Sequence, residues 1–123
     1  MNADPSPKRK MSEMISEMAA SFISGGKTPE EKHHRLTAAC SAWNMACGSP
    51  EVRRQQLEQY VEGYRQNNPA TSSSDLAKIQ KDMESLIERK LQLFPNDPRQ
   101  IVSARVMMVG TDYRIEVAAA TLK

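Results

Sequence analysis

Near its C-terminus the chain reads IVSARVMMVGTDYRIEVAA, residues 101–119, and this stretch decides the fold. Its apolar residues alternate with other residues at the period of two that is typical of β-strands, whereas those before Pro95 recur at helical spacing. Gly110 and Thr111 divide the stretch, and a glycine in the first position suits a type II′ turn. The sequence therefore predicts an antiparallel β-hairpin over Ile101–Ala119.

This turn also predicts the register of the two strands. On one face it places Arg105 opposite Glu116, a pair of opposite charge. A shift by one residue would bring apolar side chains opposite charged ones, so the pattern specifies the pairing. The apolar pairs predicted on the other face are Met108–Tyr113, Val106–Ile115, Ala104–Val117 and Val102–Ala119.

Four helices are predicted upstream of the hairpin, each from an apolar stripe at three- and four-residue spacing. Thr28-Pro29 and Ser49-Pro50 each place a capping hydroxyl before a proline, which is a strong signal for a helix start. The stripe of the third helix includes Val52, Leu57 and Tyr64. The predicted helices are 8–24, ended by a left-handed Gly25-Gly26, then 29–47, 50–66 and Asp75–Phe94, the last capped by Ser73 or Ser74.

These elements predict a mainly α (α+β) fold, in which four helices precede a C-terminal antiparallel β-hairpin that packs on the last helix. We expect residues 1–7 to be a disordered leader and residues 8–123 to form one small domain. Within that domain we distinguish a three-helix unit (8–68), a polar linker (69–74) and a unit of one helix plus the hairpin (75–123).

Composition and cysteine placement favour a cytoplasmic protein. The chain is 39% hydrophobic and 26% charged, and no apolar run approaches the roughly 20 residues of a membrane span. Cys40 and Cys47 lie seven residues apart on one predicted helix, about 10 Å along its axis. That separation is too long for a disulfide, which fits a reducing compartment.

No catalytic, cofactor or metal site is predicted. His33 and His34 are adjacent on a helix, so their rings point about 100° apart and do not readily share a metal ion. Cys40 lies on an apolar stripe with no charged neighbour that would favour a thiolate, and the helix C-terminus disfavours one at Cys47. We interpret both cysteines as structural.

A nucleic-acid-binding face is an alternative interpretation of the third helix. Arg and Gln side chains near a helix N-terminus are typical of helices that contact bases. Against this interpretation, a net charge of +2 is small and evenly spread, and glutamates lie on the same helix. The candidate contacts are Arg53, Arg54, Gln55 and Gln56, with the basic cluster Lys8-Arg9-Lys10 at the N-terminus.

The hairpin is the candidate interaction surface, because two strands alone are marginally stable in water. Each predicted strand has one free edge without a central proline or lysine, so two hairpins could pair into a four-stranded sheet. The candidate interface residues on the outer face are Ile101, Ser103, Arg105 and Met107.

The sequence thus favours a small accessory or protein-interaction module that associates with itself, as a homodimer, or with another protein. A nucleic-acid-binding regulator is the alternative hypothesis, and an enzyme without a recognisable motif is the third. The last lacks a paired acid and base, an activated nucleophile and a phosphate-binding loop. No membrane partner and no cofactor are expected.

Overall fold

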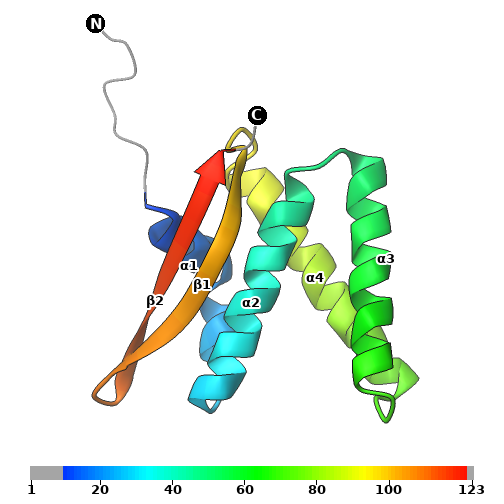
Figure 1. Cartoon of the computed structure of the whole chain (residues 1–123), viewed down its shortest axis with the longest axis horizontal. Helices are drawn as coiled ribbons and strands as arrows, with labels where there is room; N and C mark the ends of the chain where they lie inside the picture. Colours follow the sequence, from blue (N-terminus) through cyan, green and yellow to red (C-terminus); the bar gives the residue numbers. More distant parts are fainter. Residues whose placement is uncertain (1–9, 122–123) are drawn as a thin grey trace, which may run out of the picture.

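A computed structural model describes residues 10–121, and it confirms the predicted fold class. Four helices lead into a two-stranded antiparallel sheet (Figure 1). The predicted leader and the first two residues of the basic cluster lie outside the described residues. The elements are α1 (Met11–Ser24), α2 (Pro29–Ala46), α3 (Pro50–Asn67), α4 (Ser73–Leu93), β1 (Arg99–Val109) and β2 (Asp112–Thr121).

Helix α1 is kinked at Ala19, whose φ of −137° and ψ of 15° are not helical. The guanidinium of Arg89 on α4 donates to the carbonyl oxygens of Met18 and Glu17, at 2.7 and 3.0 Å. A kink leaves some main-chain carbonyl groups without their helical hydrogen-bond donors. Here the Arg89 side chain of another helix donates to two carbonyl groups beside the kink. The contact joins α1 to α4.

The glycines after α1 do not have the left-handed backbone that the sequence predicts. Gly25 has a φ of −65°, and among the described residues only Gly110 has a positive φ. Close packing, and not backbone conformation, requires glycine at position 26, because a Cβ there would lie 2.8 Å from the main-chain nitrogen of Lys32. The chain after α1 therefore passes directly against the first turn of α2.

Each of the next three helices begins after a residue whose side-chain hydroxyl caps it. Two of these caps, Thr28 and Ser49, are the predicted ones. Thr28 and Ser49 accept main-chain hydrogen bonds at 3.1 and 3.3 Å. The cap of α4 is Ser72, which accepts the Asp75 N–H at 3.1 Å, and not Ser73 or Ser74. Helix α4 consequently begins two residues before the predicted start.

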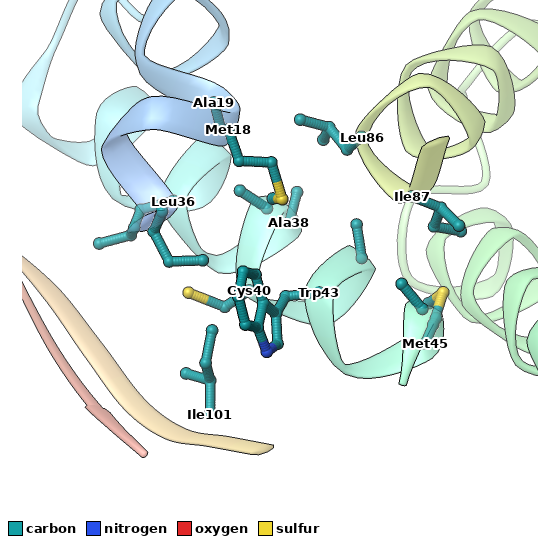
Figure 2. Close-up of a cluster of buried hydrophobic side chains, with 14 of the residues drawn as sticks. Met18, Ala19, Leu36, Ala38, Cys40, Trp43, Met45, Leu86, Ile87 and Ile101 are labelled. Atoms are coloured by element: carbon teal, nitrogen blue, oxygen red, sulfur yellow. The ribbon is translucent and has the colours of Figure 1, made fainter. Parts of the chain in front are cut away.

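Helix α2 lies at the centre of the molecule. It contacts α1, α3, α4 and β1, and its Trp43 is completely buried among side chains of α1, α4 and β1 (Figure 2). Helix α3 is peripheral, since Leu57 is its only buried side chain among the described residues. Val52 and Tyr64, predicted to be in the core, are 41% and 38% exposed.

The hairpin register agrees with the predicted one near the turn and departs from it at the base. Three of the apolar pairs and the Arg105–Glu116 pair are confirmed. The predicted Val102–Ala119 pair is wrong, because a β-bulge between Ile101 and Ser103 brings Ile101 opposite Ala119. Ile101 is therefore buried, at 9% exposure, and Val102 is 65% exposed.

The apolar face of the hairpin packs on more than one helix. Helix α2 provides the main support for β1, and α1 lies against β2 (Figure 1). The predicted contact with α4 lies at the base of the hairpin, where Lys90 bonds to the turn that leads into β1. The hairpin is thus part of the single hydrophobic core.

Candidate functional site

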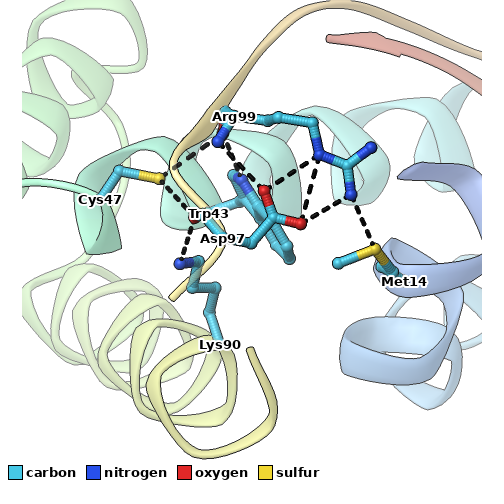
Figure 3. Close-up of polar contacts among 6 residues, drawn as sticks. All are labelled: Met14, Trp43, Cys47, Lys90, Asp97 and Arg99. Carbon is cyan, nitrogen blue, oxygen red and sulfur yellow. Dashed lines mark hydrogen bonds and ion pairs between the residues drawn. The ribbon is translucent and has the colours of Figure 1, made fainter. Parts of the chain in front are cut away.

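A buried lysine holds the base of the hairpin. Lys90 on α4 is only 1% exposed, and its ammonium donates to the carbonyl oxygen of Asp97 at 2.8 Å (Figure 3). The same ammonium lies 4.9 Å from the centre of the Trp43 ring, within the range of a cation–π interaction. Sequence reasoning missed Lys90, although its position continues the spacing of Met83, Leu86 and Ile87 on the buried stripe.

An ion pair fixes the chain as it enters β1. Arg99 donates from Nη2 and Nε to the carboxylate of Asp97 at 2.6 and 3.0 Å, and both side chains are about 15% exposed. Arg99 Nη2 also lies 3.1 Å from the sulfur of Met14 on α1. Hydrogen bonds from Arg99 hold the pKa of Asp97 below its usual 3.8, against the opposing effect of burial.

This ion pair predicts an acid-sensitive contribution to stability. Because the pKa of Asp97 is lower in the folded state, the stabilisation is complete above pH ~4 and is lost as the pH falls through the folded-state pKa. We expect Asp97→Asn to lower the free energy of unfolding by about 1–2 kcal/mol at pH 7. Urea unfolding of both proteins should show the difference shrinking below pH ~3.5; a constant difference would contradict the assignment.

Side chains of α2 occupy the outer edge of β1 at its first residues. The Asn44 amide donates to the Ile101 carbonyl at 3.0 Å and accepts the Ile101 N–H at 2.7 Å. Trp43 Nε1 donates to the Arg99 carbonyl at 2.8 Å. Asn44 therefore bonds to β1 as a neighbouring strand would, and it occupies the main-chain groups of Ile101 at this part of the edge.

The outer edge of β2 has no such cover. Within residues 10–121 the sheet has only the two strands, so β2 has a hydrogen-bonded neighbour on one side. Val109 and Asp112 flank the turn, and in a two-residue hairpin that pair exchanges main-chain bonds, which alternate along the ladder. The main-chain groups of Tyr113, Ile115 and Val117 therefore point away from β1.

One contact supports this assignment of the β2 edge. The Tyr113 N–H donates at 2.8 Å to the side-chain oxygen of Asp112 and not to β1. In Figure 1, β2 lies at the outside of the sheet, with β1 between it and α2. The edge from Tyr113 to Val117 is therefore available to another strand.

The outer face of the hairpin is charged in its middle. Arg105 pairs with Glu116 at 2.7 Å, and both side chains are well exposed, at 67% and 41%. Arg114, beside Glu116 on β2, is exposed and makes no hydrogen bond or ion pair with any residue from 10 to 121. Of the predicted interface residues, Ser103 and Arg105 are exposed and Met107 is half-buried, whereas Ile101 is in the core.

A hollow adjoins the open edge of β2. It lies between α1 and the first four residues of β2, 112–115. The helix side includes three small side chains spaced four residues apart, so that they share one side of α1. The residues from α1 are Ser12, Glu13, Ser16, Ala20 and Ile23.

The candidate nucleic-acid contacts lie along the first two turns of α3. Arg53 is half-buried and donates from Nη2 to the Gly48 carbonyl at 3.2 Å, so it braces the turn between α2 and α3. Arg54, Gln55 and Gln56 are exposed. Their binding of nucleic acid stays a prediction.

The cysteines and histidines are not part of any grouping of metal-ligand side chains in the described part of the chain. Cys40 is buried, and burial raises the pKa of its thiol to about 12. Burial also raises the pKa of Cys47, although the nearby Lys90 ammonium opposes this shift. Among residues 10–121, no three His, Cys, Asp or Glu side chains are grouped to hold a metal ion.

A second hollow is lined by residues of all four helices. Phe22, Tyr60 and Tyr64 contribute aromatic surface, and Lys78 and Asp82 line it from α4. Burial raises the pKa of Tyr60, with a smaller contribution from Tyr64. The hollow follows from the peripheral position of α3, whose contacts are with α2 and α4.

Comparison with known proteins leaves the site to be interpreted from its own geometry. The chain matches no protein-family model, no curated protein and no solved structure. None of the helices in the described part of the chain has the length and hydrophobicity that a bilayer span requires.

Proposed function

We propose that this protein is a small protein-interaction module that associates through its C-terminal hairpin and acts in the cytoplasm. The observation that carries the proposal is the outer edge of β2. Three apolar residues at alternate positions there, Tyr113, Ile115 and Val117, direct their main-chain groups away from β1. An edge of this kind is a template for another strand.

The composition of the edge supports specific pairing. Natural edge strands are often blocked by proline or lysine, and neither occurs in β2. The charged residues in the middle of β2, Arg114 and Glu116, have opposite signs and so favour a complementary partner. Two free cysteines, Cys40 and Cys47, support the cytoplasmic setting.

The molar mass in solution tests this proposal. We expect sedimentation equilibrium or light scattering to give twice the chain mass of 13.8 kDa, with a concentration-dependent transition in the micromolar range. Pairing through a short edge should be of moderate affinity, because ordering costs offset much of the gain. A mass of 13.8 kDa that persists to on the order of 100 µM would overturn self-association.

A further inference from the structure

We infer that the partner is a second copy of this chain, paired antiparallel through β2 about a two-fold axis at Ile115. This inference rests on the proposed function and specifies its register. The resulting sheet has four strands in the order β1, β2, β2, β1, with the helices of both copies on the same face. Such an interface is isologous, so each contact away from the axis occurs twice.

Charge selects this register. A two-fold axis at Ile115 places Arg114 opposite Glu116 of the second copy, and the symmetry repeats the pair. On the helix-facing side it places Tyr113 opposite Val117 of the second copy, also twice. Opposite charges and aromatic–β-branched pairs are the cross-strand combinations that stabilise antiparallel sheets.

Most neighbouring registers lack this complementarity. An axis at Tyr113 would set Arg114 opposite Asp112, but it would pair only residues 112–114, because β2 begins at Asp112. An axis at Arg114 would bring the two Arg114 side chains together and set Asp112 against Glu116. An axis at Glu116 would bring the two Glu116 side chains together. An axis at Val117 would leave both charged residues opposite alanines. Like charges directly opposite each other destabilise a sheet, so the axis at Ile115 is favoured.

The main-chain geometry agrees with the same register. Ile115 faces its own counterpart, and Tyr113 faces Val117, each with its main-chain groups pointing to the second copy. Arg114 and Glu116 then form the closer type of pair, in which the side chains are nearest to each other. The Tyr113 N–H, bonded to Asp112 in the single chain, exchanges that carboxylate for a carbonyl of the second copy.

The pairing adds a second arginine to an ion pair that already exists within each copy. Glu116 is bonded to Arg105 at 2.7 Å on one side. In the dimer it receives Arg114 of the second copy on its other side, so each glutamate lies between two arginines. Arg114, which has no ion-pair partner among residues 10–121, thereby obtains one.

The hollow beside α1 provides room for this arrangement. Side chains from the helix-facing side of the second β2 would project into the space next to residues 112–115. Ser12, Ser16 and Ala20 border that space, and their small side chains let the second copy come close. The hollow alone indicates no ligand; its position at the open edge accords with the paired strand.

Charge reversal in the full-length chain tests the register. In Arg114→Glu, both cross-pairs become Glu opposite Glu, and we expect the dimer dissociation constant to rise roughly 30-fold. In the double variant Arg105→Glu/Glu116→Arg, the pair within the hairpin is kept with its signs exchanged, but both cross-pairs become Arg opposite Arg. We expect the same weakening.

Mixing the two variants should restore association. In the mixed dimer, the carboxylate introduced at position 114 of one variant faces the guanidinium introduced at position 116 of the other. The second cross-pair, Glu116 opposite Arg114, is the native one. We expect a one-to-one heterodimer with wild-type affinity within about threefold, measured by sedimentation velocity with one variant fluorescently labelled.

Controls separate this inference from the proposed function. Arg54→Glu makes the same charge change on exposed α3 and should leave the dimer constant unchanged, while circular dichroism confirms that each variant is folded. A monomeric wild type overturns both the self-association and the register. A dimeric wild type whose Arg114→Glu variant dimerises equally well, or whose two variants do not recombine, overturns the register alone.

Discussion

Replacement of Trp43 by alanine is expected to lower the free energy of unfolding by about 3–5 kcal/mol. Trp43 is completely buried, and its ring is in contact with Phe94 at a centroid distance of 5.7 Å and with the Lys90 ammonium. The substitution removes these contacts and leaves a cavity between α1, α4 and β1. Since domains of this size have about 5–15 kcal/mol in total, the variant should lose a large part of its stability.

A second substitution separates packing from hydrogen bonding at this position. Trp43→Phe keeps an aromatic ring in the core but removes the Nε1 donor to the Arg99 carbonyl. We expect a smaller loss, about 1–2 kcal/mol, measured by urea unfolding with far-UV circular dichroism. Val52→Ala at an exposed position is the control and should stay within about 0.5 kcal/mol of wild type. Equal losses for Trp43→Ala and Val52→Ala would contradict the central role of Trp43.

Substitution of Asn44 by alanine is expected to cost about 2–3 kcal/mol. The amide makes two hydrogen bonds to Ile101, one as donor and one as acceptor. Without it, a partly buried N–H and carbonyl at the start of β1 lose their partners, and a buried group left unsatisfied is more costly than the mean hydrogen bond. Chemical unfolding and amide hydrogen exchange at Ile101 measure the effect.

The chemistry of the amide can be tested with a nearly isosteric change. Asn44→Asp retains an acceptor for the Ile101 N–H but places a carboxylate oxygen against the Ile101 carbonyl. Its destabilisation should decrease at low pH, where a protonated carboxyl can donate again. Asn68→Ala is the matched control, because that amide bonds only to the Tyr64 carbonyl in an exposed position. A loss at Asn68 as large as that at Asn44 would contradict the proposed edge role.

The helices and the hairpin were predictable because their signals are local. Thr28 and Ser49 cap helices where a hydroxyl precedes proline, and the alternation around Gly110 specifies the strand register near the turn. The bulge at Val102 was not predictable in the same way. A bulge changes which of two adjacent residues faces the core. The alternation of apolar residues does not show whether Ile101 or Val102 is the one that packs under α2.

The packing around α2 could not be predicted, because an apolar stripe does not specify which elements pack against it. Helix α2 buries alanines on several sides, so its small residues indicate close packing without indicating which neighbour approaches. Lys90 was missed because a lysine is seldom buried, although its position matches the stripe of α4. The sequence predicted two free strand edges, and the contacts of Asn44 and Trp43 with β1 distinguish them.

The Asn44 contact also bears on how such an assembly can grow, because it blocks strand pairing at the start of β1. A sheet with two open edges adds copies without end and forms fibres, whereas one with a single open edge stops after one addition. Here the amide of a helix side chain takes the place of a third strand at the start of β1. In two chains paired through β2, the first residues of each outer strand would therefore already be bonded to α2.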